Sequence, residues 1–225
     1  MTETRVLLPA VGAVLLDMDG TLLESEHASD RCWIAWCAKR GKDPAVVLPA
    51  GRGRRASATM RDLAPELGEA ELAADIEEFA VTEAADTDGI HALTGSAALL
   101  ADLRARDVPH ALVTSAGGPL ATARFTAADL VRPDVAVHGD EVTESKPHPE
   151  GFLTAARLLD VEPAACVVLE DSEAGVAAAR AAGMRVIGIG DPARELEVDA
   201  WAPHPGGVGL VREDGVWALQ VDEQG

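Results

Sequence analysis

Basic residues are scarce in this sequence. It contains 19 Lys and Arg residues against 38 Asp and Glu residues, which gives a formal net charge of −19 at pH 7. Proteins hold nucleic-acid backbones through clustered cations, so this balance excludes a general nucleic-acid-binding protein. We therefore expect no nucleic-acid partner.

Cysteines and long apolar runs are also few. The cysteines are Cys32, Cys37 and Cys166, an odd and sparse set that argues against a disulfide framework and favours a reducing cytoplasm. No stretch approaches the ~20 apolar residues of a membrane-spanning helix, so we expect a cytoplasmic protein without a membrane partner. Of the 225 residues, 48% are hydrophobic and 25% are charged. This length and composition suit one large globular domain, or one domain with an insertion. We expect a monomer or a weak dimer.

One apolar run, residues 6–16, permits two interpretations. It follows Arg5 and so resembles the core of a signal peptide, but it leads directly into Asp17 and Asp19 without a small-residue cleavage site. We favour the other interpretation, in which residues 11–16 form a buried strand.

Helical and strand-like patterns divide the rest of the chain. Residues 29–40 are typical of a helix that ends at Gly41, and the sequence stays helical to about Asp88. Beyond His91, helical stretches alternate with short apolar runs at 110–113, 135–138, 165–169 and 184–189. This alternation predicts a doubly wound, Rossmann-like α/β fold with a parallel sheet. The Asp214-Gly215 pair between two apolar runs predicts a C-terminal β-hairpin.

The predicted core is interrupted after its first strand. Residues 1–24 and 89–225 form the α/β core, and residues 25–88 form an inserted all-helical domain. Parallel sheets of this kind bind ligands at the carboxyl ends of their strands. The polar residues that follow the apolar runs are therefore the candidates for a functional site.

These polar residues suit phosphoryl chemistry. They are Asp17, Asp19, Thr114, Ser115, Lys146, Glu170 and Asp171. Carboxylates placed close together repel one another unless a cation neutralises them, and oxygen ligands without Cys or His favour Mg²⁺. A lysine and a hydroxyl beside such a metal suit a phosphoryl group, whose charge must be stabilised during transfer. An aspartate nucleophile would split that transfer into two steps through an aspartyl phosphate.

The same residues carry a resemblance to a known family. The strings DMDGT at 17–21, ALVT ending at Thr114, ESKPHPE around Lys146 and VVLEDSEAGVAAARAAGM around Glu170 resemble the four motifs of the haloacid dehalogenase (HAD) superfamily. A helical insertion just after the first motif resembles the subfamily with a small α-helical cap. That subfamily includes sugar- and polyol-phosphate phosphatases and β-phosphoglucomutase, which act on small phosphorylated metabolites.

The resemblance implies a role for each core residue. Asp17 would be the nucleophile and a metal ligand. Asp19 would protonate the leaving alcohol and then deprotonate the attacking water, and its backbone carbonyl would bind the metal. Thr114 and Lys146 would hold the phosphate oxygens. Asp171 would complete the Mg²⁺ site, with Glu170 beside it as an alternate or more distant ligand. A true dehalogenase lacks the second aspartate, so the presence of Asp19 argues for phosphoryl chemistry.

Arginines in the insertion are candidates for substrate binding. Arg52, Arg54 and Arg55 form a local positive patch in an acidic chain, which favours an anionic substrate over the alternative of a solvated loop. We expect Arg52 and Arg55 to bind substrate, together with Ser115 at the end of its strand. A closing cap would then provide the specificity.

Two alternatives to a phosphatase stay open. Mutase relatives carry a cap histidine and a cap arginine where this sequence has Ser29 and Ala56, so hydrolysis is preferred, although His27 lies close to the first position. A non-catalytic phosphate-binding regulator on the same fold is the other alternative. The presence of both Asp17 and Asp19 argues against it.

Overall fold

A six-stranded parallel sheet forms the centre of the computed structural model, which describes residues 5–223. The strand order is β6-β5-β2-β7-β8-β9. Their bounds are β2 (Ala13–Leu16), β5 (His110–Val113), β6 (Val135–Val137), β7 (Cys166–Glu170), β8 (Arg185–Ile189) and β9 (Ala200–Ala202). The doubly wound parallel sheet expected from the sequence is thus confirmed, and all four residues of β2 are buried at its centre.

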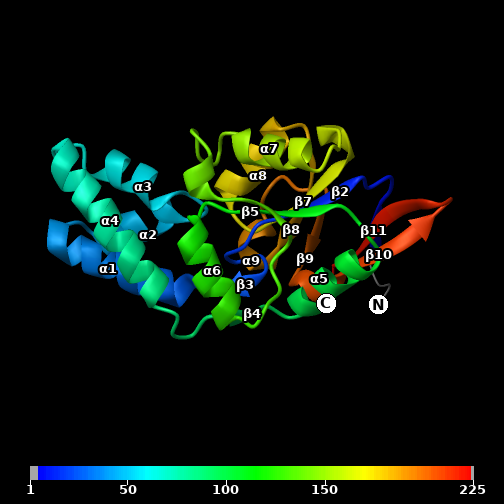
Figure 1. Ribbon diagram of the computed structural model, residues 1–225, viewed down its shortest axis with the longest axis horizontal. Coiled ribbons are helices and arrows are strands. Elements are labelled where there is room, and N and C mark those ends of the chain that lie inside the picture. Colours follow the sequence, from blue (N-terminus) through cyan, green and yellow to red (C-terminus); the bar gives the residue numbers. More distant parts are fainter. Residues whose placement is uncertain (1–4, 224–225) are drawn as a thin grey trace.

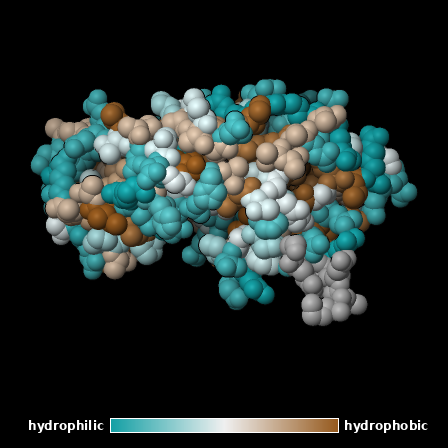
Figure 2. All heavy atoms as spheres, turned by 90° about the horizontal axis from the view of Figure 1, so that it is seen from below, coloured by the Kyte–Doolittle hydropathy of each residue, from teal (hydrophilic) through white to brown (hydrophobic). Residues whose placement is uncertain are grey.

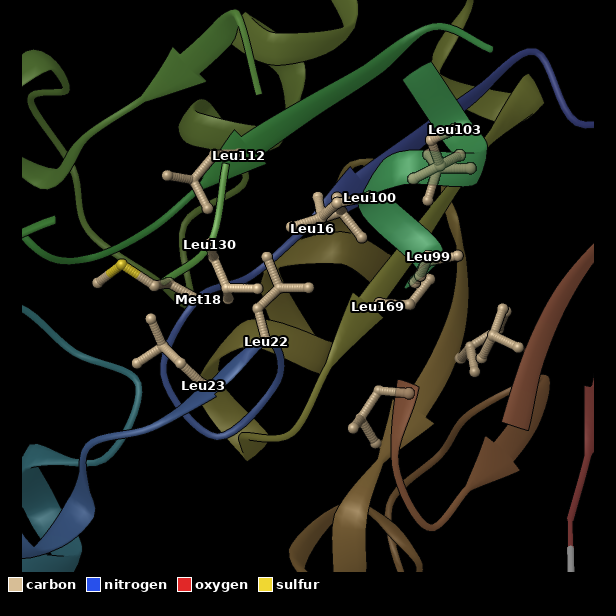
Figure 3. Close-up of a cluster of buried hydrophobic side chains, with 14 of the residues drawn as sticks. Leu16, Met18, Leu22, Leu23, Leu99, Leu100, Leu103, Leu112, Leu130 and Leu169 are labelled. Carbon is tan, nitrogen blue, oxygen red and sulfur yellow. The ribbon is translucent and has the colours of Figure 1, made fainter. Parts of the chain in front are cut away.

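Helices cover both faces of the sheet (Figure 1). On one face lie α5 (Ser96–Ala105) and α6 (Gly118–Ala127), and on the other lie α7 (Glu150–Leu158) and α8 (Glu173–Ala181); the single-turn α9 (Gly190–Ala193) follows β8. Alternate residues of each strand point to opposite faces, so Leu16 packs toward α5 whereas Leu15 packs toward α7 and α8. Figure 3 shows part of the first of these two layers, in which Leu16 and Leu169 of the strands lie beside Leu100 and Leu99 of α5.

Four helices follow β2 as a separate lobe, the blue to green segment at the left of Figure 1. They are α1 (Glu26–Arg40), α2 (Pro44–Gly51), α3 (Ala56–Leu63) and α4 (Glu69–Ala85). This inserted lobe, called the cap below, has its own apolar cluster around Trp33, Trp36, Met60 and Phe79. The short strands β3 (Leu23–Glu24) and β4 (His91–Ala92) pair antiparallel where the chain leaves and re-enters the core. The sequence predicted the helical insertion but not this strand pair.

The predicted C-terminal hairpin is present as β10 (Val208–Glu213) and β11 (Val216–Asp222). Its turn residues Asp214 and Gly215 have φ values of 48° and 83°, the positive values that a tight hairpin turn requires. A third strand, β1 (Arg5–Leu8), pairs with β11. The apolar run at 6–16 therefore contributes strands to two different sheets, which a single predicted strand at 11–16 did not anticipate.

Hydrophilic residues dominate the face of the molecule seen in Figure 2, with hydrophobic residues in small groups among them. Within residues 5–223, no helix has both the length and the hydropathy needed to cross a membrane.

Candidate active site

Three neighbouring strands bring the predicted core residues to one edge of the sheet. Asp17 directly follows β2, Thr114 directly follows β5, and Glu170 is the last residue of β7. Because β5, β2 and β7 are adjacent and parallel, their carboxyl ends lie side by side. Asp171 continues from β7, and Lys146 arrives from the loop between β6 and α7.

Lys146 is the centre of this group. Its Nζ donates to Asp17 Oδ1 at 2.5 Å, to Glu170 Oε2 at 2.7 Å and to the carbonyl oxygen of Val113 at 3.3 Å. Lys146, Asp17 and Glu170 are all buried. One ammonium group therefore balances two carboxylates at the end of the central strands, and all three groups are held in a protein interior where charges interact strongly.

The charges of this group shift one another's pKa values. Burial, together with the charges of Glu170 and Asp19, raises the pKa of Asp17 to about 8 against the opposing effect of Lys146. Burial also raises the pKa of Asp171 well above its usual range, with further contributions from Glu170 and Asp17. Burial alone would lower the pKa of Lys146, but its two carboxylate partners raise it. The cluster thus carries more negative charge than Lys146 alone can stabilise.

A divalent cation fits this cluster. Asp17, Glu170 and Asp171 each offer a carboxylate oxygen, and these oxygens lie within 4.8 Å of one another. The donors are all oxygen atoms, as a hard cation such as Mg²⁺ prefers. Gly20 lies so close that a Cβ there would sit 2.1 Å from Asp171 Oδ2, so a glycine is required to leave room for that carboxylate.

Glu170 is held rigidly by the start of α8. Its Oε1 accepts from Ser172 Oγ at 2.8 Å and from the backbone nitrogens of Ser172 and Asp171 at 3.1 and 3.2 Å. A Cβ at Gly175 would lie 2.0 Å from this carboxyl group. Ser172, which also caps α8 by accepting from the nitrogen of Gly175, was not among the predicted residues. The Asp-Ser step before an apolar helix is the sequence signal that could have identified it.

Asp19 lies at the border between the core and the cap. Its Oδ1 accepts from Ser25 Oγ at 2.6 Å, and its Oδ2 accepts from Arg124 Nη1 at 2.7 Å. Its charge also contributes to the raised pKa of Asp17, so the two aspartates interact. Arg124 was not predicted as a site residue. The sequence signal that could have identified it is an arginine at helical spacing from Leu120, Ala121 and Phe125, the residues that form the buried face of α6.

The predicted phosphate-side residues lie next to the cap. Thr114 is buried, and its Oγ1 accepts from the nitrogen of Ala116 at 3.1 Å. Ser115 donates from Oγ to the carbonyl oxygen of Gly53 at 2.8 Å, which ties the core directly to the cap loop. Gly53 has a φ of +68°, and a Cβ there would lie 2.2 Å from Ser172 Oγ. The loop around Gly53 therefore rests on the core beside the carboxylate cluster.

The three cap arginines do not converge. Arg52 pairs with Glu26 and Asp30 inside the cap, and Arg54 pairs with Asp62 at 2.6 Å. Arg55 instead crosses to the core. Its guanidinium donates to the carbonyl oxygens of three core residues at 2.6 to 2.9 Å, namely Gly139, Val142 and Thr143.

A cleft of about 510 Å³ opens between the cap and the core. The cap contributes Arg54 and, from α3, Ala58, Arg61 and Asp62. The core contributes residues 144–149, which include Glu144 and Lys146. Lys146, which donates to Asp17, is one of the residues that line this cleft. The lining carries charges of both signs, and Arg54 is already paired with Asp62.

The chain is similar in sequence to phosphatases. It is 40% identical over 188 residues to hexitol phosphatase A of Escherichia coli (strain K12), a match that covers 82% of this chain and 87% of that protein. It is 34% identical over 180 residues to validoxylamine A 7'-phosphate phosphatase of Streptomyces hygroscopicus subsp. limoneus, covering 78% of this chain and 84% of that protein.

Solved structures have the same fold. CbbY from Rhodobacter sphaeroides in complex with phosphate superposes with a TM-score of 0.76 at 25% identity, covering 87% of this chain and 95% of that one. β-Phosphoglucomutase from Clostridium difficile gives 0.79 at 21% identity, covering 87% and 92%. The sequence model of haloacid dehalogenase-like hydrolases matches residues 11–183, more than half of the chain. The protein therefore belongs to the haloacid dehalogenase-like hydrolase family.

Proposed function

We propose that this protein is an Mg²⁺-dependent phosphatase that hydrolyses a sugar or polyol phosphate through a phosphorylated Asp17. As a member of this family with phosphatase relatives, the chain is a phosphoric monoester hydrolase. The observation that carries the finer proposal is the burial of Lys146 between Asp17 and Glu170, 2.5 and 2.7 Å away, with Asp171 beside them. We further propose residues 25–88 as a cap domain over a core of residues 1–24 and 89–225.

In the first step, an Asp17 carboxylate oxygen attacks phosphorus, and the bond from phosphorus to the substrate oxygen breaks. Asp19 gives its proton to that departing oxygen, so the alcohol leaves neutral. In the second step, Asp19 takes a proton from water, whose oxygen attacks phosphorus and releases phosphate from Asp17. Thr114 and Lys146 hold the phosphoryl oxygens during both steps, and Lys146 balances their charge.

The metal site would use the same oxygen cluster. Asp17, Asp171 and the backbone carbonyl of Asp19 would hold Mg²⁺, with Glu170 as an alternate ligand. When bound, the ion neutralises negative charge on the cluster and on the phosphoryl group. The support for this assignment is the all-oxygen donor set and the presence of three carboxylates, Asp17, Glu170 and Asp171, beside the single cation of Lys146.

Substrate class is proposed from the relatives and the cap. By their names, one relative is a hexitol phosphatase and the other is a phosphatase of validoxylamine A 7'-phosphate. Ser115, Arg52 and Arg55 would contact the non-reacting part of the substrate. For Arg55 to do so, it would exchange core carbonyl oxygens for substrate oxygens, and Arg52 would compete with its partners Glu26 and Asp30.

A phosphosugar mutase is the second candidate, favoured by the shared fold with β-phosphoglucomutase. The cap residues argue for hydrolysis, because Ser29 occupies the position of the mutase histidine and its hydroxyl donates to Glu83 at 3.0 Å. A non-catalytic regulator is the least favoured function, since both aspartates are present.

One experiment separates these functions. Purified protein with Mg²⁺ is assayed against a panel of hexitol, pentitol and sugar phosphates, with phosphate release and isomer formation scored together. We expect phosphate release that chelator abolishes and that Asp17→Asn eliminates in a folded protein. Isomer formation without phosphate would establish the mutase instead. Full activity in excess chelator, or in Asp17→Asn, would refute the metal or the nucleophile assignment.

A further inference from the structure

Arg124 is a buried charge that the assigned roles do not use. It lies on α6 with 4% of its surface exposed, on a helix face otherwise formed by Leu120, Ala121 and Phe125. A guanidinium on such a face is costly to bury, and an apolar residue of similar size would pack there without that cost. The position therefore demands an explanation in terms of what the guanidinium holds.

The two arms of the guanidinium hold two carboxylates on different lobes. Nη1 donates to Asp19 Oδ2 in the core at 2.7 Å, and Nη2 donates to Glu83 Oε1 on α4 of the cap at 2.9 Å. Glu83 is itself nearly buried and accepts from Ser29 Oγ on α1 at 3.0 Å. Glu83 therefore has a fixed position in the cap, and it fixes the second arm of Arg124.

Asp19 is oriented from both of its oxygens as a result. Ser25 Oγ, where the chain enters the cap, holds Oδ1 at 2.6 Å, and Arg124 holds Oδ2. Because Ser25 holds one oxygen of Asp19 and Arg124 holds the other, the two bonds together set the angle of the carboxylate. The planar guanidinium keeps its arm to Asp19 in a fixed direction while its other arm is bonded to Glu83, which a lysine ammonium would not do. Proton transfer requires the carboxyl group to be within hydrogen-bond reach of the leaving oxygen, so its orientation governs the rate.

We propose that Arg124 is a positioning residue for Asp19 and that Glu83 is the cap residue that holds Arg124 in place. This inference rests on the proposed function, in which Asp19 protonates the leaving group. Arg124 acts through Asp19 and does not touch the substrate. Losing it should therefore impair the formation of phosphorylated Asp17 in proportion to how much the leaving group needs a proton.

The test compares two leaving groups. An alkyl phosphate, the best substrate of the panel above, leaves as a strongly basic alkoxide that requires protonation. 4-Nitrophenyl phosphate leaves as a stable phenolate that does not. The measured quantity is kcat/KM, because it reports the formation of the phosphorylated enzyme for both substrates. Asp19→Asn is the reference variant. The matched control is Arg104→Met. Arg104 lies on α5, is exposed, and donates to the backbone carbonyl oxygen of Arg132.

We expect Arg124→Lys to lower kcat/KM for the alkyl phosphate about 10- to 100-fold, part of the ~10²–10⁴-fold that general acid catalysis contributes. The loss should appear in kcat with KM little changed, and the aryl phosphate should lose less than about threefold. Glu83→Gln keeps the size of the side chain and should give the same pattern more weakly. It also serves as the second variant if Arg124→Lys unfolds, which thermal unfolding would reveal. Arg104→Met should match the wild type.

Each failure has a distinct meaning. If Asp19→Asn impairs both substrates equally, the acid role of Asp19 in the proposed function is wrong. If Asp19→Asn is selective but neither Arg124→Lys nor Glu83→Gln is, the positioning role is refuted. If the Arg124 and Glu83 variants raise KM for polyol phosphates at unchanged kcat, the pair binds substrate hydroxyls instead, and the inference is again overturned.

Discussion

At the scale of single residues, the site depends on charge balance in a buried space. Lys146 pairs with Asp17 and Glu170, and Asp171 lies beside them, so one cation faces three carboxylates. A divalent cation would supply the positive charge that the carboxylates lack, and it would also attract a phosphoryl group. Lys146 is therefore the residue that neutralises most of the negative charge here, although it forms no bond to phosphorus in the proposed reaction.

Replacing Lys146 tests this dependence. Lys146→Met should abolish phosphate release, because the phosphoryl charge loses its partner. It should also lower the free energy of unfolding by about 3–5 kcal/mol without divalent cations, since two buried carboxylates lose their cation. Urea unfolding and phosphate release measure the two effects. An unchanged free energy of unfolding would contradict this prediction, because it would mean that Asp17 and Glu170 become protonated or hydrated in the variant at little cost in free energy.

Arg55 tests the division between core chemistry and cap recognition. Arg55→Ala should raise KM for the best sugar or polyol phosphate about tenfold, the ~1–3 kcal/mol of a charge-assisted hydrogen bond, with kcat little changed. 4-Nitrophenyl phosphate, which lacks the polyol, should be affected much less. Equal damage to both substrates would indicate that Arg55 serves the contact between cap and core, where it donates to Gly139, Val142 and Thr143, and not recognition.

At the scale of secondary-structure elements, the contact between the cap and the core rests on one loop and one helix pair. The loop at Gly53 lies against Ser172 and is bonded by Ser115, while α4 reaches α6 through Glu83 and Arg124. These contacts come from segments far apart in the chain. They place parts of two lobes within a few ångströms of the carboxylate cluster.

Gly53→Ala should disturb this loop selectively. The left-handed φ of +68° is unfavourable for alanine, and its Cβ would lie 2.2 Å from Ser172 Oγ. We expect kcat/KM to fall at least about tenfold for all phosphomonoesters, with a loss of ~1–2 kcal/mol in stability. Gly68→Ala is the control, because Gly68 has a φ of −68° and no heavy atom within 4 Å of the added Cβ. Equal effects of the two substitutions would refute the specific role of the loop.

Within the cap, α1 and α4 are joined by Asp75. This nearly buried carboxylate accepts from Arg40 at 2.6 and 2.7 Å and from Trp36 at 2.8 Å. The hydrogen bonds from Arg40, opposed by burial and helped by Lys39, hold the pKa of Asp75 well below its usual range. A lowered folded-state pKa contributes stability above the unfolded-state pKa, and this stability is lost as the pH falls below it.

Asp75→Asn should therefore destabilise the protein by about 2 kcal/mol at pH 7. Its deficit relative to the wild type should shrink as the pH falls from about 5 to about 2, because Asp75 of the unfolded wild-type chain then takes up a proton that the folded protein, with its lowered pKa, does not bind. Urea unfolding of both proteins across this pH range measures the difference. A deficit that stays constant with pH would show that packing, and not charge, accounts for the effect of the substitution.

At the scale of the whole molecule, net charge opposes the compact state. The value of −19 at pH 7 and the isoelectric point of about 4.5 imply mutual repulsion over the surface. The cap arginines reduce this repulsion locally, since Arg52 and Arg54 pair with cap carboxylates. Salt should reduce it generally.

Raising the NaCl concentration from about 10 to about 150 mM at pH 7.5 shortens the Debye length from roughly 30 to 8 Å. We expect the unfolding temperature to rise by about 2–4 °C, corresponding to ~1 kcal/mol for a protein of this size. Near pH 4.5, where the net charge approaches zero, the same increase in salt should have little effect. A lower unfolding temperature in salt at pH 7.5 would mean that attractive ion pairs outweigh the net repulsion.

The fold and the core of the site could be predicted because their signals are local in the chain. Buried parallel strands read as continuous apolar runs, and their carboxyl ends must meet at one edge, so the positions of Asp17, Thr114 and Glu170 relative to the sheet followed from the sequence. The strand β1 was missed because its four residues merge with the next apolar run. Strand β9 was missed because three residues are too few for a periodic signal.

What lay beyond the sequence was which charges meet across the two lobes. Arg124 precedes no motif, and Glu83 looks like one of many acidic residues on a helix, yet burial places them 2.9 Å apart and within reach of Asp19. The three cap arginines are neighbours in sequence, but their side chains reach different partners. Arg52 and Arg54 pair with carboxylates of the cap, whereas Arg55 donates to carbonyl oxygens of the core. Spacing along the chain defines which groups are available, whereas packing of the cap on the core defines which partner each one reaches.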